Sequence, residues 1–335
     1  MALSPAETNR MKRVRIAGAG LAGSAAAIAA LQAGAPVRMW DPARIPKHKV
    51  CGEFLTPEIE PVLRQLDLWE PFLAENPARM TRMRLSFGSG VSEGRFATPA
   101  FGLSRYRLDG LLRNEAERRG AEWIVERVPG QVDIVAHGRQ AANTGRNRLF
   151  GFKAHFRGPA TDAVELYFFD DFYVGVNAIE GGLTNVCGLG LESGMRRLGF
   201  DYDALVASRP ELADRLRPLT RCLEWLTTGP LVYDSRLVAP PTDMFLAGDA
   251  LQFVDPFTGT GMSVAIWTGA LAGRFAAENR SASEFYGTVR SGIARQYKWC
   301  GLLRGAMQKR WPLSIAPFLP PSWLYSLTRP KLECR

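Results

Sequence analysis

The alternation of apolar and polar positions over the first 41 residues predicts a strand, a helix and a second strand. Residues 12–17 read KRVRIA and end in a short apolar run, which is typical of a buried strand. Small and apolar residues continue from there to about residue 33, as in a helix that packs closely on its neighbours. Residues 36–40, PVRMW, predict a second strand that ends at Asp41. This order predicts a βαβ unit and a parallel sheet.

Helical periodicity and short apolar runs recur further along the chain. Helices are predicted over 57–74, 107–119, 260–278 and 282–310, and buried strands over 132–136 and 244–248. Between 150 and 191 the pattern changes to strict alternation, which indicates an antiparallel sheet. We therefore expect a discontinuous first domain and a second domain inserted into it. The predicted division is 1–75, 95–150 and 230–280 for the first domain, 76–94 and 151–229 for the second, and 281–335 for a C-terminal helical segment.

Composition narrows the class of protein only moderately. The chain has 335 residues, 46% of them hydrophobic and 22% charged, which excludes a disordered chain. Its formal net charge is +9, and 35 of the 42 basic residues are Arg. Arg suits anionic partners, but these residues are scattered along the chain, so we expect no nucleic-acid partner.

Cysteine and histidine usage argues against disulfides and metals. The five Cys form no CxxC pair, which favours reduced thiols and a cytoplasmic location. Of the three His, His48 lies three residues before Cys51, but no second ligand pair accompanies them. We therefore predict no metal site.

A glycine motif follows the first strand and opens the first helix. In GAGLAG, Gly18 permits the tight turn, Gly20 lets the backbone approach a pyrophosphate, and Gly23 lets helix and strand pack. Ala22 belongs to the same motif. Asp41, 18 residues after Gly23, stands where a carboxylate would hydrogen-bond an adenosine ribose. The motif predicts dinucleotide binding; a glycine-rich turn with a buried cap is the alternative.

A second motif near residue 250 is of the flavin type. A strand ends at Gly248-Asp249, and Pro256 and a glycine pair precede the long helix. Asp249 is placed to hold ribitol or pyrophosphate groups. The amides at the helix start are placed to stabilise negative charge on a reduced isoalloxazine. The residues of this second cofactor contact are Gly259, Thr260, Gly261 and Met262.

Two further segments make the chain resemble the FAD-dependent p-hydroxybenzoate hydroxylase superfamily, and within it the geranylgeranyl reductase and monooxygenase branch. The segment KVCGEFL, beginning at Lys49, is similar to that branch's Cys-Gly loop beside the flavin, and SRYRLD is similar to its Arg-bearing helix start. The resemblance covers about residues 12–275. It implies one FAD, with contacts from Lys49, Cys51, Gly52 and Arg105 and the isoalloxazine between Cys51 and Pro256. The implied fold is α/β: a three-layer FAD/NAD(P)-binding Rossmann-like domain, a smaller antiparallel β-sheet substrate domain and C-terminal helices.

The chain departs from this pattern in three places. His137 stands where the superfamily usually has the Asp of an Asp-Gly motif, and the hairpin before it is missing, which puts the usual nicotinamide contact in doubt. We still count His137 among the cofactor-binding positions. The Tyr-x-Trp-x-Phe-Pro motif of geranylgeranyl reductases and the Trp-x-Trp-x-Ile-Pro motif of halogenases are both absent.

Four residues are predicted to be catalytic: Cys51, Lys153, His155 and Pro256. Lys153 and His155 are two apart in a strand and share one face, from which they could orient or protonate a substrate. The alternative is a polar pair that faces the surface. Cys51 is either a reactive thiol or a space-filling side chain.

These observations favour an FAD-dependent monooxygenase that uses NAD(P)H as a transient reductant and O2 on an aromatic or lipophilic substrate. One alternative is reduction of a carbon–carbon double bond in a lipid-like substrate, and another is an FAD-binding carrier without turnover. The apolar, proline-broken segment 311–326 is too short to span a bilayer. With Trp311 and neighbouring basic residues it predicts either peripheral membrane contact, with a substrate presented by a membrane or carrier, or simple packing on the domain.

Overall fold

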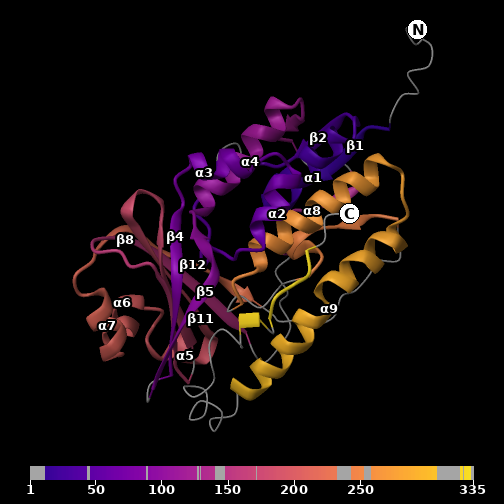
Figure 1. The fold of residues 1–335 in the computed structure, drawn as a ribbon. Coiled ribbons are helices and arrows are strands. Elements are labelled where there is room, and N and C mark those ends of the chain that lie inside the picture. Colours follow the sequence, from indigo (N-terminus) through magenta and orange to yellow (C-terminus); the bar gives the residue numbers. More distant parts are fainter. Residues whose placement is uncertain are drawn as a thin grey trace, which may run out of the picture.

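Two β-sheets organise the chain (Figure 1). The computed structural model describes residues 12–43, 46–87, 90–126, 128, 130–139, 148–170, 172–231, 243–252, 258–307, 325–326 and 328–332, with the backbone alone at 297 and 301–307. In Figure 1 the larger sheet stands on the left, and the domain built on the smaller sheet lies to the upper right.

The smaller sheet is parallel throughout and has the order β13-β7-β1-β2-β6. Its strands are β1 (Val14–Ala17), β2 (Val37–Trp40), β6 (Glu122–Ile124), β7 (Ile134–Val135) and β13 (Phe245–Leu246). The four strands predicted in these regions are present, although shorter than expected. Strand β6 carries no sequence signal of its own: it is three residues long and only partly buried.

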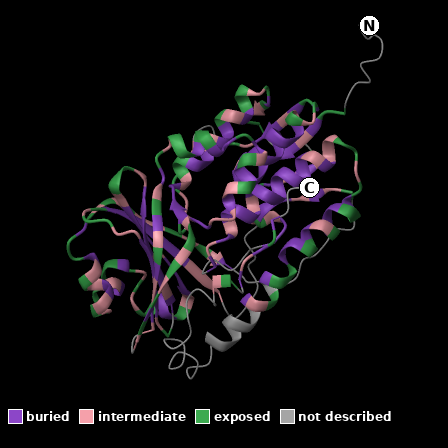
Figure 2. Ribbon diagram, viewed as in Figure 1, coloured by how far each residue is buried: buried purple, intermediate pink, exposed green. Residues whose placement is uncertain are grey.

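Helices of small residues allow this domain to pack tightly. The four main helices are α1 (Leu21–Gln32), α4 (Arg105–Arg118), α8 (Gly261–Ala277) and α9 (Ala282–Met307). A Cβ at Gly269 of α8 would lie 2.1 Å from the carbonyl oxygen of Ala22, and one at Gly273 would lie 2.0 Å from that of Ala26. Two glycines therefore let α8 lie directly on α1, and Figure 2 shows both helices almost entirely buried.

The helix predicted over 57–74 is divided into two. Helix α2 (Ile59–Gln65) and helix α3 (Trp69–Ala74) are separated at Asp67, whose φ is +57°. A left-handed residue cannot continue an α-helix, so the chain turns there. Both pieces still bury most of their large apolar side chains, including Val62, Leu63 and Phe72.

The larger sheet has eight strands in the order β12-β8-β11-β10-β9-β4-β5-β3. Its strands are β3 (Phe54–Leu55), β4 (Ala78–Ser86), β5 (Val91–Gly102), β8 (Leu149–Arg157), β9 (Ala163–Phe168), β10 (Phe172–Ile179), β11 (Leu183–Leu191) and β12 (Thr220–Leu231). All neighbours pair antiparallel except β4 and β9. The antiparallel sheet predicted over 150–191 is thus present. The predicted boundary at residue 95 falls inside β5, the one at 150/151 inside β8 and the one at 229/230 inside β12, while the rest of the domain division stays a prediction.

Three short helices cover one face of this sheet at the left of Figure 1. They are α5 (Glu192–Arg197), α6 (Tyr202–Ala207) and α7 (Pro210–Leu216). Tyr202 stacks on Phe152 of β8 with ring centroids 4.6 Å apart, and Trp225 packs edge-on against the same ring. The face opposite these helices is left to line the cavity described below.

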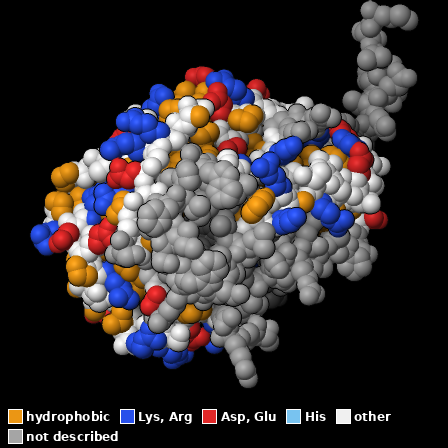
Figure 3. Space-filling model, turned by 60° about the horizontal axis from the view of Figure 1, so that its bottom comes forward, with side chains coloured by type: hydrophobic (Ala, Val, Ile, Leu, Met, Phe, Trp, Pro, Cys, Tyr) orange, Lys and Arg blue, Asp and Glu red, His pale blue; other side chains and the backbone are white. Residues whose placement is uncertain are grey.

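The last long helix completes the core of the first domain. Phe285, Tyr286, Val289 and Ile293 of α9 are buried against α8 and the smaller sheet. They do not line the cavity described below, so these side chains complete the core and do not contact a ligand there. None of the described helices is both long and apolar enough to cross a membrane. On the face in Figure 3, basic and acidic side chains of the described residues are interspersed.

Candidate functional site

One cavity of about 830 Å³ runs from the first glycine loop to the open face of the eight-stranded sheet. Its first half is lined by polar groups and backbone at the carboxyl ends of the parallel strands. Its second half is lined mainly by apolar side chains of the large sheet. In α/β folds, ligands bind at the carboxyl edge of the parallel sheet, so the first half is the expected place for a cofactor.

The glycines of the first motif play different structural roles. Gly18 has φ +101°, and a Cβ there would lie 2.5 Å from the Ala136 carbonyl oxygen. A Cβ at Gly23 would lie 1.8 Å from the Gly18 carbonyl oxygen. Neither residue lines the cavity, so both shape the loop from behind. Gly20 does line it, and a Cβ there would meet only the Lys49 ammonium, at 3.9 Å.

The N-terminus of α1 opens onto the cavity. Gly20, Leu21 and Ala22 all line it, and no acidic side chain stands in the first turn of the helix. The N–H groups of a first turn lack partners within their helix and carry partial positive charge. This end of the cavity is therefore suited to an anionic group.

Asp41 and Arg113 hold the strand ends that frame this end. The Asp41 carboxylate accepts hydrogen bonds from the Ala19 and Ala43 amides, each at 2.8 Å. The buried Arg113 donates to the carbonyl oxygens of the same two residues. It also lies over the Trp123 ring at 4.2 Å. Asp41 itself lines the cavity.

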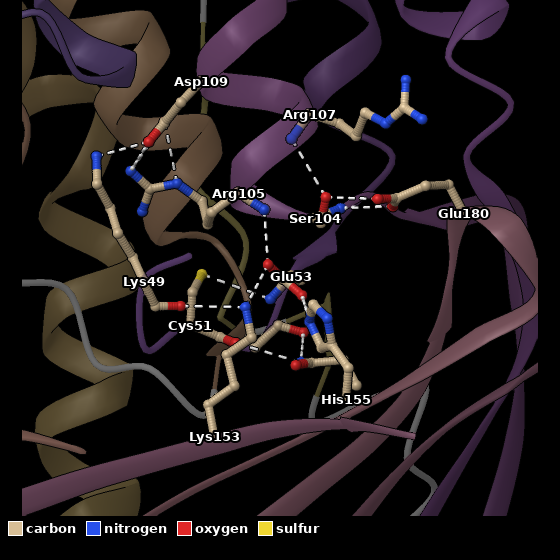
Figure 4. Close-up of polar contacts among 12 residues, drawn as sticks. Lys49, Cys51, Glu53, Ser104, Arg105, Arg107, Asp109, Lys153, His155 and Glu180 are labelled. Atoms are coloured by element: carbon tan, nitrogen blue, oxygen red, sulfur yellow. Dashed lines mark hydrogen bonds and ion pairs between the residues drawn. The ribbon is translucent and has the colours of Figure 1, made fainter. Parts of the chain in front are cut away.

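Three charged side chains, those of Lys49, Arg105 and Asp109, form a cluster of ion pairs beside the cavity. Asp109 accepts from the Lys49 ammonium at 2.6 Å and from the Arg105 guanidinium at 3.0 Å. Burial raises the pKa of Asp109, but these two cations outweigh burial and hold the pKa below its ordinary value. Asp249 lines the cavity opposite; burial raises its pKa, and the charges of Arg105, Arg139 and Lys49 only partly offset this. Figure 4 shows Lys49 and Arg105 converging on Asp109.

Most of the second predicted motif also reaches the cavity. Gly248, Gly259, Gly261 and Met262 line it, the last two at the start of α8. Thr260 does not line it; the Thr260 hydroxyl bonds to Thr258 and accepts from Gln296. Pro256 lies outside the described residues.

The Cys51-Gly52 loop is held from the large sheet. Both residues line the cavity, and the Asn185 amide of β11 donates to both of their carbonyl oxygens, at 3.2 and 2.8 Å. A Cβ at Gly52 would meet nothing within 4 Å, so the backbone there faces open space. Burial raises the pKa of the neighbouring Cys187 thiol, which also lines the cavity.

Lys153 and His155 do share one face of β8, and that face points at Glu53 (Figure 4). The Lys153 ammonium lies 2.5 Å from one carboxylate oxygen of Glu53, and His155 Nε2 lies 2.7 Å from the other. Glu53 also accepts from the Arg105 amide at 2.6 Å. Lys153 and His155 are buried behind the loop and do not line the cavity, whereas Glu53 does. The alternative of a surface-facing pair is therefore wrong, and direct contact with a substrate is not what this geometry offers.

The second half of the cavity is an apolar chamber. Its walls are Met83, Leu85, Phe87, Phe96, Val164, Leu166, Phe168, Leu189, Leu226 and Leu231, with Tyr173, Asn177 and Tyr325 as polar groups. Strands β4, β5, β9, β10, β11 and β12 supply nearly all of them. Such a chamber favours a hydrophobic molecule fixed by a few polar groups.

The structure places His137, which replaces the usual Asp of the superfamily, beside the cavity. His137 is exposed, follows β7 and lines the cavity. Among the described residues between Ile124 and Ile134 there is no strand, so the hairpin usual in the superfamily does not occur there.

Sequence reasoning missed four residues that contribute to this site. Glu53 stands within the Cys-Gly loop, and its partners become evident only when β8 is placed beside it. Asn185 looks like any polar residue in a strand. Tyr325 and Arg329 return to the cavity from the C-terminal segment, and Arg329 donates to the Thr258 carbonyl at 2.7 Å. The role of Glu53 has no local sequence signal, because its partners Lys153 and His155 lie 100 and 102 residues later in the chain.

Comparisons with known proteins agree with a flavoenzyme fold. No protein-family model matches the chain. It is 29% identical over 310 residues to a menaquinone reductase of Mycobacterium tuberculosis, covering 77% of this chain and 75% of that protein. It is 28% identical over 319 residues to a menaquinone reductase of Mycolicibacterium smegmatis, covering 79% and 76%.

Solved structures share the architecture at low sequence identity. A flavoprotein/dehydrogenase of Cytophaga hutchinsonii superposes with a TM-score of 0.74 at 18% identity, covering 89% of this chain and 86% of that one. The flavin-dependent brominase Bmp2 gives 0.75 at 17% identity, covering 96% and 95%. The flavin-dependent halogenase CmlS gives 0.70 at 21% identity, covering 95% and 67%. The predicted α/β fold is confirmed, and the similarity to the menaquinone reductases bears out the prediction of an enzyme.

Proposed function

We propose that this chain is an FAD-dependent reductase of a hydrophobic, quinone-class substrate. The observation that carries the proposal is the continuous cavity, polar and glycine-lined at one end and apolar at the other. Similarity to two menaquinone reductases supports the choice of substrate class. A menaquinone is a flat naphthoquinone with an apolar chain, which suits such a chamber.

The residues of the polar half fit FAD. Gly20 and Gly52 turn bare backbone toward open space, where a side chain would otherwise take the room of a ligand. The first turn of α1 offers amides to a pyrophosphate, and Asp41 stands at the ribose position. Gly261 and Met262 offer the start of α8 to the isoalloxazine, while Arg105 and Asp249 lie between the two ends. When bound, FAD supplies two-electron transfer, and the protein supplies position, dipoles and exclusion of water.

The reductant in this proposal is NAD(P)H, which docks only transiently. The chain has one glycine fingerprint of the dinucleotide type, and we assign that to FAD. His137 stands at the entrance to the polar half, where the superfamily places an Asp. We therefore expect slow or substrate-gated reduction of the flavin by NAD(P)H.

The apolar chamber selects the substrate and excludes water. Leu166, Val164 and Phe168 of β9 would contact a flat ring or an apolar chain, and Tyr173 and Asn177 would orient a carbonyl. Glu53, Asn185 and Lys153 hold the Cys51-Gly52 loop between this chamber and the isoalloxazine position. Membrane presentation of the substrate through the segment 311–326, of which only 325 and 326 are described, is part of the proposal.

Monooxygenation of an aromatic or lipophilic substrate is the alternative chemistry for the same cavity. The two differ in their need for O2, so one experiment separates them. Purified protein with FAD and NAD(P)H is incubated with a prenylated naphthoquinone in detergent, under nitrogen and in air, and the products are weighed by mass spectrometry. We expect a product heavier by two hydrogens under nitrogen that reverts to the quinone in air, as a hydroquinone does. A product heavier by two hydrogens that is stable in air would show reduction of a carbon–carbon double bond instead. A product heavier by one oxygen, formed only in air, would establish monooxygenation instead, and tight FAD binding with no product in either gas would favour the carrier.

A further inference from the structure

His48, a histidine beside the cavity, makes ring contacts that have no role in the proposed function so far. His48 is exposed and also lines the cavity wall, so its imidazole faces both solvent and the site. Its ring stacks on Tyr106 with centroids 5.2 Å apart and meets the His155 ring edge-on at 5.2 Å. A nitrogen of His48, a nitrogen of His155 and an oxygen of Glu53 all lie within 4.8 Å of one another. One water molecule can bridge such a gap.

Next to His48, the buried side chains of Lys153 and His155 both bond to the Glu53 carboxylate. Glu53 accepts from Lys153, from His155 and from the Arg105 amide, so its carboxylate is fixed from two elements, β8 and α4. Burial raises the pKa of Glu53, yet His155 and Lys153 outweigh burial and hold the pKa below its ordinary value. Glu53 therefore stays ionised near neutral pH and is a poor proton donor.

The proposed reaction needs a proton donor at this place. Two-electron reduction of a quinone to the hydroquinone requires a hydride, which bound reduced FAD would supply, and one proton, which the protein must deliver. Burial raises the pKa values of the Cys187 thiol and the Tyr325 phenol, both of which line the cavity, so neither releases a proton readily. An imidazole open to water can take up a proton from solvent and release it near neutral pH.

We propose that His48 carries this proton from solvent to the substrate side of the cavity, and that Glu53, Lys153 and His155 are positioning residues that hold it there. The inference rests on the proposed function, since it names the proton donor of that reaction. Partial desolvation at the cavity wall lowers the pKa of the exposed His48, and the charges of Lys153 and His155 lower it further, against the opposing charges of Glu53 and Glu180. Removing Lys153 must therefore raise the pKa of His48.

The same three groups could also suggest a divalent cation, but the charges argue against one. Glu53 already carries the Lys153 ammonium at 2.5 Å on one oxygen and His155 at 2.7 Å on the other. A dication would have to displace His155 and lie close to the Lys153 charge. A stoichiometric metal ion in the purified holoenzyme would overturn the proposal.

The first test does not depend on any substrate. The chain has only three histidines, so NMR titration of the imidazole C–H signals, assigned with single variants, reads each one separately. We expect Lys153→Met to move the His48 titration to higher pH and Glu53→Gln to move it to lower pH. Lys47→Gln, an exposed neighbour, serves as the control and should change the titration little. A His48 titration that ignores both buried substitutions would overturn the inference, whatever the enzyme reduces.

The second test measures the proton itself. Photoreduced holoenzyme is mixed anaerobically with a naphthoquinone, which needs a proton, or with ferricyanide, which accepts single electrons and no proton. We expect His48→Gln to slow naphthoquinone reduction at least tenfold, to remove the fall in rate at high pH, and to leave the ferricyanide rate and the flavin spectrum unchanged. Equal slowing of both acceptors, or an unchanged pH profile, would show that His48 is not the donor. If wild-type enzyme reduces ferricyanide but no quinone, the proposed function fails, and the NMR result still stands or falls by itself.

Discussion

The carboxylate of Glu53 and the ammonium of Lys153 lie 2.5 Å apart, and neither side chain reaches solvent. Glu53 belongs to the loop that follows the first domain's βαβ unit, and Lys153 belongs to β8 of the eight-stranded sheet. Glu53 directly precedes β3, the edge strand of the same sheet, so the pair ties this loop to a distant strand of that sheet. Its placement makes the Cys51-Gly52 loop dependent on the large sheet.

Removing one partner of this pair should destabilise the protein strongly. Lys153→Met leaves the Glu53 charge buried with fewer partners, and breaking a buried pair costs about 3–5 kcal/mol. We expect a loss of roughly that size in the free energy of unfolding, measured by urea titration of the apoprotein. The double variant Glu53→Gln with Lys153→Met should recover part of the loss. Equal stability of wild type and Lys153→Met would mean that the pair is open in solution.

The same cluster sets a dependence on acid pH. Because the pKa of Glu53 is lower in the folded protein than in the unfolded chain, its ionised form stabilises the fold. This contribution is present above the ordinary pKa of a Glu and is lost as the pH falls through the folded value. Wild-type stability should therefore decline more steeply on acidification than that of Glu53→Gln. Parallel curves for the two proteins, from thermal unfolding between pH 7 and pH 3, would contradict this assignment.

Substitutions at two glycines of the first motif should have different effects, one on FAD binding and one on folding. A side chain at Gly20 would project into the cavity, so Gly20→Val should fold but lose FAD affinity at least 100-fold in calorimetry. A side chain at Gly23 would collide with the Gly18 carbonyl, so Gly23→Val should fail to fold. Gly287→Ala on the exposed side of α9 is the matched control and should bind FAD normally. Normal FAD affinity in Gly20→Val would place the cofactor elsewhere.

Replacing Asp249 should affect the stability of the apoprotein and the binding of FAD in opposite directions. Desolvation raises the pKa of Asp249, so its ionised form is disfavoured in the folded apoprotein; this penalty declines as the pH falls through the raised pKa and vanishes below the ordinary pKa of an Asp. Because the Asp249 side chain is exposed to solvent, Asp249→Asn should raise the Tm of the apoprotein only slightly at pH 7 and not at all near pH 3. It should also weaken FAD binding, since the carboxylate faces the cofactor half of the cavity. A lower Tm together with unchanged FAD affinity would contradict this assignment.

Filling the apolar chamber should separate substrate from cofactor. Leu166 lines the chamber from β9, and Leu166→Trp adds a large ring there. We expect the KM for a prenylated naphthoquinone to rise at least tenfold while FAD content stays at one per chain. Leu166→Met conserves volume and should behave like wild type. An unchanged KM in the Trp variant would show that the substrate binds outside this chamber.

Periodicity and glycine spacing predicted the first domain well because its signals are local. The strand, glycine turn and helix of the βαβ unit are each specified within about ten residues, and the helix α4 that bears Arg105 shows its own amphipathic pattern. The break at Asp67 was missed because left-handed backbone at a non-glycine residue has no pattern of its own. Strand β4 buries only every third residue and β12 buries only its last, so neither shows the apolar pattern of a core strand.

The site was predicted only where its residues lie near a motif. Lys153 and His155 were singled out from their two-residue spacing, but the partner that explains them stands 100 residues earlier. Long-range pairing of β8 with β11 and the approach of the Glu53 loop decide that contact, and neither appears in a single sequence. For the same reason the return of Tyr325 and Arg329 to the cavity could not be foreseen.

In the proposed reaction, reduced flavin in this protein passes its electrons to a hydrophobic quinone. Photoreduced holoenzyme is mixed in an anaerobic stopped-flow instrument with a prenylated naphthoquinone in detergent, and in parallel with buffer that contains O2 alone. We expect the flavin absorbance to return in a fast phase that saturates with quinone concentration, well ahead of the reaction with O2, and the hydroquinone to appear in equal amount. Flavin that is reoxidised rapidly by O2 and not by the quinone would contradict the claim.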